Sequence, residues 1–392
     1  MSQALYRGTT IARLVTVTRN PSNTFSVPRR RVFKITIGLT SKGRSGRFVS
    51  AIILLGILSA FVFAWRAHRG STVLPYDGTV WDNPPSSLPS GIIHGTYHSA
   101  VMNVDVGYNI YVPPQHATNP TQSFPVIYWL HGAQSEDENS DVSTWQPLLH
   151  SAVGSGQLPP MIMVWANGAH NSKYMDAAVG SPMYGLEMVE TTVIGELIPH
   201  IDSTYRTIAS RQGRAIQGVS IGGMGALRFA FKHPQMFSSV FAIAPAVDDN
   251  ASNVLINEPK LMAAMFNNDP NLFDQNTAAS LATVNAANLR GLAIHVVIGS
   301  EDALLPSNQD LLAKLTGLNI PHDPLEIVNG VGHDPRIVAS IGMQNLQFAA
   351  KYFVPPPPPT RAYRNNCRLR TGILQQWNPP GTRIGDSRST CK

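Results

Sequence analysis

Short apolar runs alternate with helical patterns through the middle of the chain. The runs are apolar on both faces, as strands of a parallel sheet must be when helices cover both sides. They occupy residues 124–130, 160–166, 214–219, 238–244, 293–299 and 324–328. Residues 99–113 alternate between apolar and polar instead, which predicts an antiparallel strand or hairpin. Helical spacing of apolar residues falls in 184–205, in the segment after residue 220, in 309–317 and in 337–353. This order predicts an α/β fold with a mostly parallel sheet and helices on both faces.

One apolar run near the N-terminus is longer than the others and resembles a membrane-spanning segment. Phe48–Trp65 is apolar all round and, at about 1.5 Å per residue, spans roughly 27 Å, which is enough for the hydrocarbon core of a bilayer. Ten Lys or Arg precede this run and two closely follow it. The positive-inside rule therefore predicts a cytoplasmic N-terminus and an extracytoplasmic remainder. We expect a transmembrane signal-anchor here, with a cleaved signal peptide and an organelle transit peptide as alternatives.

The two ends of the chain differ in composition from its middle. Residues 1–70 hold twelve Lys or Arg and no Asp or Glu. Residues 71–354 hold eleven Lys or Arg and twenty-three Asp or Glu, and residues 355–392 hold seven Lys or Arg and one Asp. The predicted organisation is a basic segment at 1–47, the membrane segment at 48–65, a linker at 66–88, one domain at 89–354 and a Pro-rich, then basic tail at 355–392.

This charge distribution and the cysteine positions exclude several classes of function. The acidic middle offers no phosphate-binding face, so nucleic acid is not an expected partner. Both cysteines, Cys367 and Cys391, lie in the basic tail. The predicted domain therefore has no disulfide framework and no thiolate metal site. The sequence does not determine the oligomeric state.

The stretch "IQGVSIGGMGALRFAFKHP" (216–234) contains the first candidate for chemistry. It places Ser220 between Gly218 and Gly222, directly after an apolar run and before a helical pattern. A serine in so sharp a turn presents its hydroxyl at the edge of the sheet, and the glycines prevent a clash. We interpret Ser220 as a nucleophile at a strand-to-helix elbow; the alternative is a plain turn with a hydroxyl cap.

A serine hydroxyl needs a base, and the base needs an acid that orients it. In folds of this class the three residues follow the order Ser, Asp or Glu, His. "VVIGSEDALLP" supplies Asp302 after one predicted strand, and "VNGVGHDP" supplies His333 after the next. We predict that Asp302 is the acid and His333 the base. Glu301 and either Asp248 or Asp249 are the rivals for the acid.

The remaining candidates lie in loops that follow predicted strands. Backbone N–H groups of Ala133, after "VIYWLHG", and of Ile221, after the serine, are predicted to stabilise an oxyanion. Gln134, Trp145 and Tyr174 are weaker candidates for substrate binding, and for Trp145 and Tyr174 packing in the core is the alternative. No metal site and no organic cofactor are expected.

Five motifs together resemble the esterase D family of α/β-hydrolases: "YWLHGAQ", "VIGELIPHIDSTYRT", "GRAIQGVSIGGMGALRFAFKHPQMF", "GSEDALL" and "GVGHD". That family includes S-formylglutathione hydrolases, feruloyl and acetyl-xylan esterases and mycolyltransferases. The resemblance covers about 89–354 and does not extend to 1–88 or 355–392. It implies an α/β-hydrolase fold without a large cap domain. It also assigns the nucleophile, acid and base to Ser220, Asp302 and His333, and the oxyanion donors to Ala133 and Ile221.

The resemblance implies hydrolysis of carboxylic esters through an acyl-enzyme, by a domain that is membrane-anchored or exported. The membrane segment argues against a cytosolic formylglutathione hydrolase. Asp302 and His131 stand where mycolyltransferases have Glu and Asp, so trehalose does not carry over as the acceptor. One alternative is an acyltransferase that moves the acyl group of an ester or acyl-sugar to a sugar or another alcohol. The other is a non-catalytic, membrane-tethered binding module.

Overall fold

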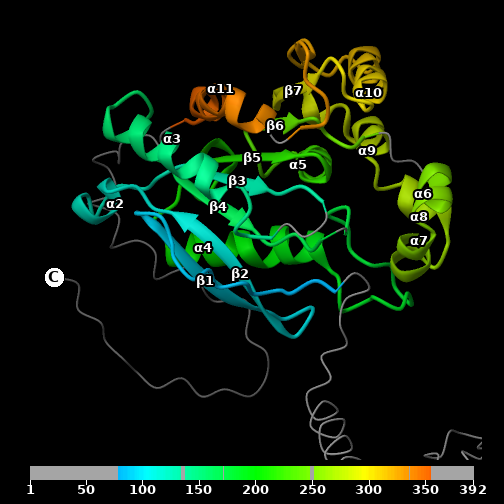
Figure 1. The fold of residues 1–392 in the computed structure, drawn as a ribbon, viewed down its shortest axis with the longest axis horizontal. Coiled ribbons are helices and arrows are strands. Elements are labelled where there is room, and N and C mark those ends of the chain that lie inside the picture. The colour runs from blue at the N-terminus through cyan, green and yellow to red at the C-terminus, as the bar shows by residue number, and fades with distance from the viewer. Residues whose placement is uncertain (1–77, 134–136, 171, 248–250, 335, 355–392) are drawn as a thin grey trace, which may run out of the picture. The chain divides into compact units, whose positions relative to one another are not determined.

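The computed structural model describes residues 78–133, 137–170, 172–247, 251–334 and 336–354 (Figure 1). All of these residues belong to one unit of the chain, Val73–Lys392. Its described strands form a single sheet: β1 Ile92–Ser99, β2 Val104–Tyr111, β3 Val126–Leu130, β4 Ile162–Ala166, β5 Arg214–Val219, β6 Ser239–Ile243, β7 Ala293–Gly299 and β8 Glu326–Val328. The predicted two-sided runs supply β3 to β8, with ends that differ by at most two residues.

The sheet has the order β1-β2-β4-β3-β5-β6-β7-β8. Neighbours from β4 to β8 pair in parallel, whereas β1 pairs with β2, and β2 with β4, in antiparallel fashion. The predicted hairpin is therefore present, but its first strand begins at Ile92, earlier than the alternating pattern indicated. This arrangement is that of an α/β-hydrolase fold, and it confirms the predicted α/β class with a mostly parallel sheet.

Helices cover both faces of the sheet. Alternate residues of β3 divide between two hydrophobic cores: Val126, Tyr128 and Leu130 face one, and Ile127 and Trp129 face the other. The first core receives α4 (Ile198–Thr204), α5 (Ile221–Lys232), α9 (Ala278–Asn285) and α10 (Leu305–Gly317). The second receives α3 (Val142–Gly154) and α11 (Arg336–Tyr352), which lie side by side in Figure 1.

The helix predicted over 184–205 differs in form. It consists of a π-helical stretch, η2 (Thr191–Leu197), followed by α4. Pro199 is the second residue of α4, directly after η2, and because it has no N–H it donates no hydrogen bond back to the π-helical stretch. The proline therefore marks a change of helix type within one segment. Short helices α2 (Gln115–Thr118), η3 (Arg211–Gly213) and η4 (Asn288–Gly291) complete the loops.

Several helices have no counterpart in the sequence-based expectation. Helix α3 was missed, and so were the helices between β6 and β7: α6 (Ala251–Asn257), α7 (Pro259–Phe266), α8 (Pro270–Asp274) and α9. Figure 1 shows α6, α7 and α8 grouped beyond one end of the sheet. Helices α6 to α9 are short, and the hydrophobic pattern of a helix of five to eight residues is too brief to stand out.

The described residues contain no helix that is both long and apolar enough to cross a bilayer. The predicted membrane segment 48–65, the basic segment before it and the tail after residue 354 lie outside the described residues.

Candidate active site

Ser220 lies at the turn between β5 and α5, as the glycine pattern predicted. Its backbone adopts φ 57° and ψ −120°, a conformation that non-glycine residues rarely adopt. The turn is held by the Ser220 N–H, which donates to the Ile243 carbonyl oxygen at 2.9 Å, and by the Ser220 carbonyl, which accepts from Met224 N–H. Strain at one residue of a tight turn is typical of a site where a side chain must be presented.

The flanking glycines are required by close backbone approaches. A Cβ atom on Gly218 would lie 2.4 Å from the Gly222 carbonyl oxygen. A Cβ atom on Gly222 would lie 2.1 Å from the carbonyl oxygen of Leu130 and 2.3 Å from that of His131. The turn after β5 therefore packs directly against the end of β3. This contact fixes the position of Ser220 relative to the loop that follows β3.

The His333 ring lies between Ser220 and Asp302. Its Nε2 atom is 2.9 Å from Ser220 Oγ, and its Nδ1 atom is 2.8 Å from Asp302 Oδ2. A carboxylate on Nδ1 fixes the proton there, so Nε2 carries the lone pair that can accept the serine proton. The structure thus brings together the three residues that the sequence order selected.

Asp302 is buried and hydrogen-bonded, whereas its rival Glu301 is exposed. The Asp302 side chain is buried, and its Oδ1 accepts a hydrogen bond from the Leu304 N–H at 2.9 Å. The Glu301 side chain is exposed and forms no hydrogen bond to His333. Asp248 and Asp249 lie outside the described residues.

Ala133 and Ile221, the two predicted oxyanion donors, both lie beside Ser220. Ala133, Gly132 and Ser220 line one cleft, and Ile221 is the first residue of α5. Among the described residues, neither backbone N–H has a hydrogen-bond acceptor. Both donors are therefore available to a substrate, as an oxyanion hole requires.

His131 stabilises the loop after β3, which contains Ala133. It is fully buried, its Nδ1–H donates to the Gly132 carbonyl oxygen at 2.8 Å, and its Nε2 accepts from the Gly168 N–H at 3.0 Å. Burial lowers the pKa of His131 to about 4, so the ring is neutral at physiological pH. The side chain therefore joins the loop after β3 to the loop after β4.

Two of the weaker candidates are corrected by the structure. Trp145 and Tyr174 are fully buried and do not line the cleft. Trp145 packs on Trp129 with ring centroids 4.8 Å apart, and it also contacts α11 at Gly342. The Tyr174 hydroxyl donates to the His131 carbonyl oxygen at 3.0 Å. Both residues pack beneath the site, which is the alternative that the sequence left open. Gln134 lies outside the described residues.

The cleft that exposes Ser220 has a volume of about 230 Å³. Apolar side chains form much of its wall, and two carboxylates, Asp141 and Asp334, also line it: Gly132, Ala133, Asp141, Val219, Ser220, Ala244, His333, Asp334, Ile337 and Val338. Arg336 holds the pKa of Asp334 at about 2, so Asp334 is ionised at neutral pH.

Asp141 is a lining residue that sequence reasoning missed. It precedes α3 with φ 63°, and its Oδ2 accepts a hydrogen bond from Trp129 Nε1 at 3.1 Å. Burial raises the pKa of this carboxyl. An Asp before a helix start is a visible signal of an N-cap, but only the packing of α3 against β3 places the side chain at the cleft.

Comparisons with known proteins identify the family. A family model described as "Putative esterase" matches residues 99–319. An esterase of Mycobacterium tuberculosis is 25% identical over 254 residues, which cover 60% of this chain and 54% of that protein. A xylanase/feruloyl esterase of Xylanibacter ruminicola is 29% identical over 133 residues, which cover 33% of this chain and 18% of that protein. The chain thus spans about half the length, or less, of these curated relatives.

Solved structures agree with this assignment. A ferulic acid esterase superposes with a TM-score of 0.57 at 27% identity, over 67% of this chain and 98% of that one. An S-formylglutathione hydrolase from Agrobacterium tumefaciens has the same TM-score at 21% identity and shares the fold. The superposition covers 68% of this chain and 98% of that one. Because the family model matches more than half of the sequence, this chain belongs to the esterase family that its motifs predicted.

Proposed function

We propose that this chain is a serine esterase that hydrolyses carboxylic esters through an acyl-enzyme. Ser220 Oγ attacks the ester carbonyl while His333 Nε2 takes the serine proton. The Ala133 and Ile221 N–H groups stabilise the oxyanion of the tetrahedral intermediate. His333 then gives its proton to the leaving alcohol. Water attacks the acyl-enzyme with the same ring as base, which returns the serine and releases the acid.

The observation that carries this proposal is the position of the His333 ring. Its two nitrogens contact a serine oxygen and a buried carboxylate at 2.9 and 2.8 Å. A binding module has no use for a serine held in a strained turn against an oriented imidazole. The arrangement therefore favours catalysis over the non-catalytic alternative.

The exposure of the same ring favours hydrolysis over acyl transfer. The His333 side chain is 44% exposed. Water can therefore reach Nε2 and be activated there once the acyl-enzyme has formed. A transferase must keep water away from this atom.

The charge of the cleft points to a class of substrate. Asp141 and Asp334 contribute carboxylates, and no Lys or Arg is among the described lining residues. The cleft therefore offers an anionic acyl group no cation to pair with, so we expect neutral esters. Val219, Ile337 and Val338 offer apolar contacts, and the relatives named feruloyl or ferulic acid esterase make a hydroxylated aromatic acyl group a reasonable first choice.

We also propose that residues 48–65 anchor the enzyme in a membrane, with the esterase domain on the extracytoplasmic side. Ten Lys or Arg before this segment against two just after it support that orientation. Protease added to intact cells should then digest the domain. Full protection of the domain would overturn this orientation.

Labelling with a fluorophosphonate probe tests the catalytic proposal directly. The purified wild-type chain should react at Ser220, and Ser220→Ala should not be labelled. Wild type should hydrolyse neutral p-nitrophenyl esters and release free acid, with little transfer to an added sugar. Equal labelling of Ser220→Ala would overturn the proposed nucleophile. Transfer that exceeds hydrolysis would support the acyltransferase instead.

A further inference from the structure

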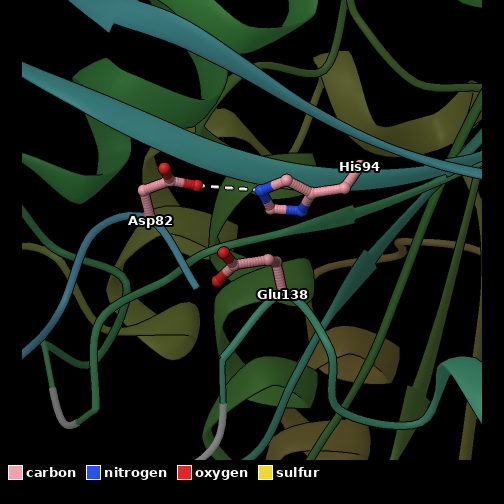
Figure 2. A group of neighbouring side chains, drawn as sticks. All are labelled: Asp82, His94 and Glu138. Atoms are coloured by element: carbon pink, nitrogen blue, oxygen red, sulfur yellow. Dashed lines mark hydrogen bonds and ion pairs between the residues drawn. The ribbon is translucent and has the colours of Figure 1, made fainter. Parts of the chain in front are cut away.

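A His, an Asp and a Glu from three separate segments converge outside the catalytic cleft. Asp82 lies in the segment before β1, His94 lies in β1, and Glu138 lies in the loop between β3 and α3 (Figure 2). One ligand atom of each residue lies within 4.8 Å of the others. None of the three lines the cleft that exposes Ser220.

The hydrogen bonds around His94 fix its tautomer. Asn109 Nδ2 donates to the Glu138 backbone carbonyl at 2.9 Å and to Asn139 Oδ1 at 2.8 Å. Asn109 Oδ1 is therefore the atom that faces His94 Nδ1, at 3.0 Å, and it must accept a hydrogen bond from the Nδ1–H of the ring. A neutral His94 thus has its hydrogen on Nδ1 and a lone pair on Nε2.

That lone pair faces another acceptor. His94 Nε2 lies 2.8 Å from Asp82 Oδ1. Two lone pairs at this distance repel each other unless a positive charge lies between them. Either a second proton on His94 or a metal ion can supply that charge.

The position of Glu138 favours the metal ion. A Cβ atom on Gly107 would lie 2.4 Å from Glu138 Oε1 and 2.8 Å from Asp82 Oδ1, so both oxygens turn toward the space that this glycine leaves open. Glu138 is fully buried, and among the described residues no Lys or Arg forms an ion pair with it or with Asp82. Two carboxylates and a neutral imidazole balance the charge of one divalent cation, whereas one proton balances only one carboxylate.

The surrounding amides orient the buried carboxylate. Glu138 Oε1 accepts from the Asn83 N–H at 2.7 Å, and Oε2 accepts from Asn167 Nδ2 at 2.8 Å. Outer hydrogen bonds of this kind, together with an Nδ1–H bond on the histidine, are typical of metal sites. Two ligands about 2.1 Å from zinc are roughly 3.0 to 3.4 Å apart, so Asp82 and His94 need to separate only slightly.

We propose that Asp82, His94 and Glu138 bind one divalent transition-metal ion, with zinc the best match. Imidazole nitrogen together with carboxylate oxygen selects zinc over magnesium and calcium, which prefer oxygen alone. The ion would join the segment before β1 and the β1–β2 hairpin to the loop after β3. That loop contains Ala133 and Asp141, which both line the cleft. The ion would therefore stabilise the part of the chain that shapes the cleft.

Zinc binding to the full-length chain tests this proposal. The chain is purified with Cys367→Ser and Cys391→Ser, so that the tail thiols contribute nothing, and is then stripped with a chelator. Calorimetric titration should show one equivalent of bound zinc. At about 100 times Kd, zinc should raise Tm by roughly 5 °C or more, while equal concentrations of magnesium or calcium should not. His94→Gln should lose both effects.

His98→Gln is the matched control. His98 lies on the same strand and pairs with Asp105 at 2.9 Å, but both side chains are largely exposed. This variant should bind zinc as the parent does. Absence of stoichiometric zinc binding by the parent would overturn the proposal in favour of a protonated His94. Equal zinc binding by His94→Gln, or an equal response to calcium, would overturn it as well.

Discussion

His131 Nε2 accepts a hydrogen bond from the Gly168 N–H at 3.0 Å, and this contact links the loops that follow β3 and β4. It requires a neutral ring. Because burial lowers the pKa of His131 to about 4, the unfolded chain binds a proton between about pH 6.5 and pH 4 that the folded chain does not. The free energy of unfolding must therefore fall as the pH is lowered through this window.

The first prediction isolates that contribution with His131→Gln, which keeps a polar side chain that does not titrate. Urea unfolding at pH 7 and pH 4.5 should show that wild type loses about 2 kcal/mol more stability than the variant over this interval. The comparison with the variant removes the effects of the other histidines. Identical pH dependence in the two proteins would show that His131 is not held neutral by burial.

The second prediction concerns the acid of the proposed triad. Asp302→Asn should leave the fold intact but place the His333 proton on the wrong nitrogen, and kcat should fall about 10⁴-fold, or about 5.5 kcal/mol of transition-state stabilisation. Glu301→Gln, with its exposed side chain, should cost no more than about tenfold. The measurement is steady-state hydrolysis of a p-nitrophenyl ester.

Two further variants complete that series. Ser220→Ala sets the floor of activity, and combining it with Asp302→Asn should produce no additional loss, because parts of one catalytic unit fail together. Asp248→Asn should stay within about tenfold of wild type. If Asp248→Asn abolishes activity while Asp302→Asn does not, the acid has been assigned to the wrong strand.

The third prediction compares two glycine substitutions. Gly222→Ala would bring Cβ to 2.1 Å from the Leu130 carbonyl oxygen, and backbone cannot move aside easily. We expect loss of the native fold or of all activity. Gly154→Ala, at the end of α3, meets nothing within 4 Å and should be neutral or stabilise by about 0.4 to 1 kcal/mol. Thermal unfolding measures both, and an active, normally stable Gly222→Ala would contradict the tight packing of the elbow on β3.

The fourth prediction separates a packing role from substrate binding at Tyr174. Tyr174→Phe removes the hydroxyl that donates to the His131 carbonyl and leaves that buried oxygen without this partner. Stability should fall by about 1 to 3 kcal/mol, and kcat should decrease with little change in KM, because the loop that carries Ala133, one of the two proposed oxyanion donors, loosens. An increase in KM at unchanged stability would instead restore Tyr174 as a substrate contact.

Local sequence patterns were sufficient where a feature depends on neighbouring residues. The elbow at Ser220 follows from glycines two residues away on either side, and the strands from β3 to β8 follow from their two-sided apolar runs. The order of Ser220, Asp302 and His333 was also informative, because the carboxyl ends of parallel strands meet at one edge of the sheet. The π-helical form of η2 and the short helices α6 to α9 lacked a comparable pattern.

Tertiary structure alone decided which polar and aromatic residues serve the site. Trp145 and Tyr174 follow strand ends in the sequence, yet α3 and α5 bury them, because side-chain direction depends on how a helix packs on the sheet. Asp141 reaches the cleft for the same reason. Asp82, His94 and Glu138 come from three segments with no shared motif, so only the pairing of β1 with β2 and the fold of the loop after β3 bring them together. The sequence determined the fold class and the chemistry of single loops, since these depend on local spacing, whereas contacts between distant segments needed the folded chain.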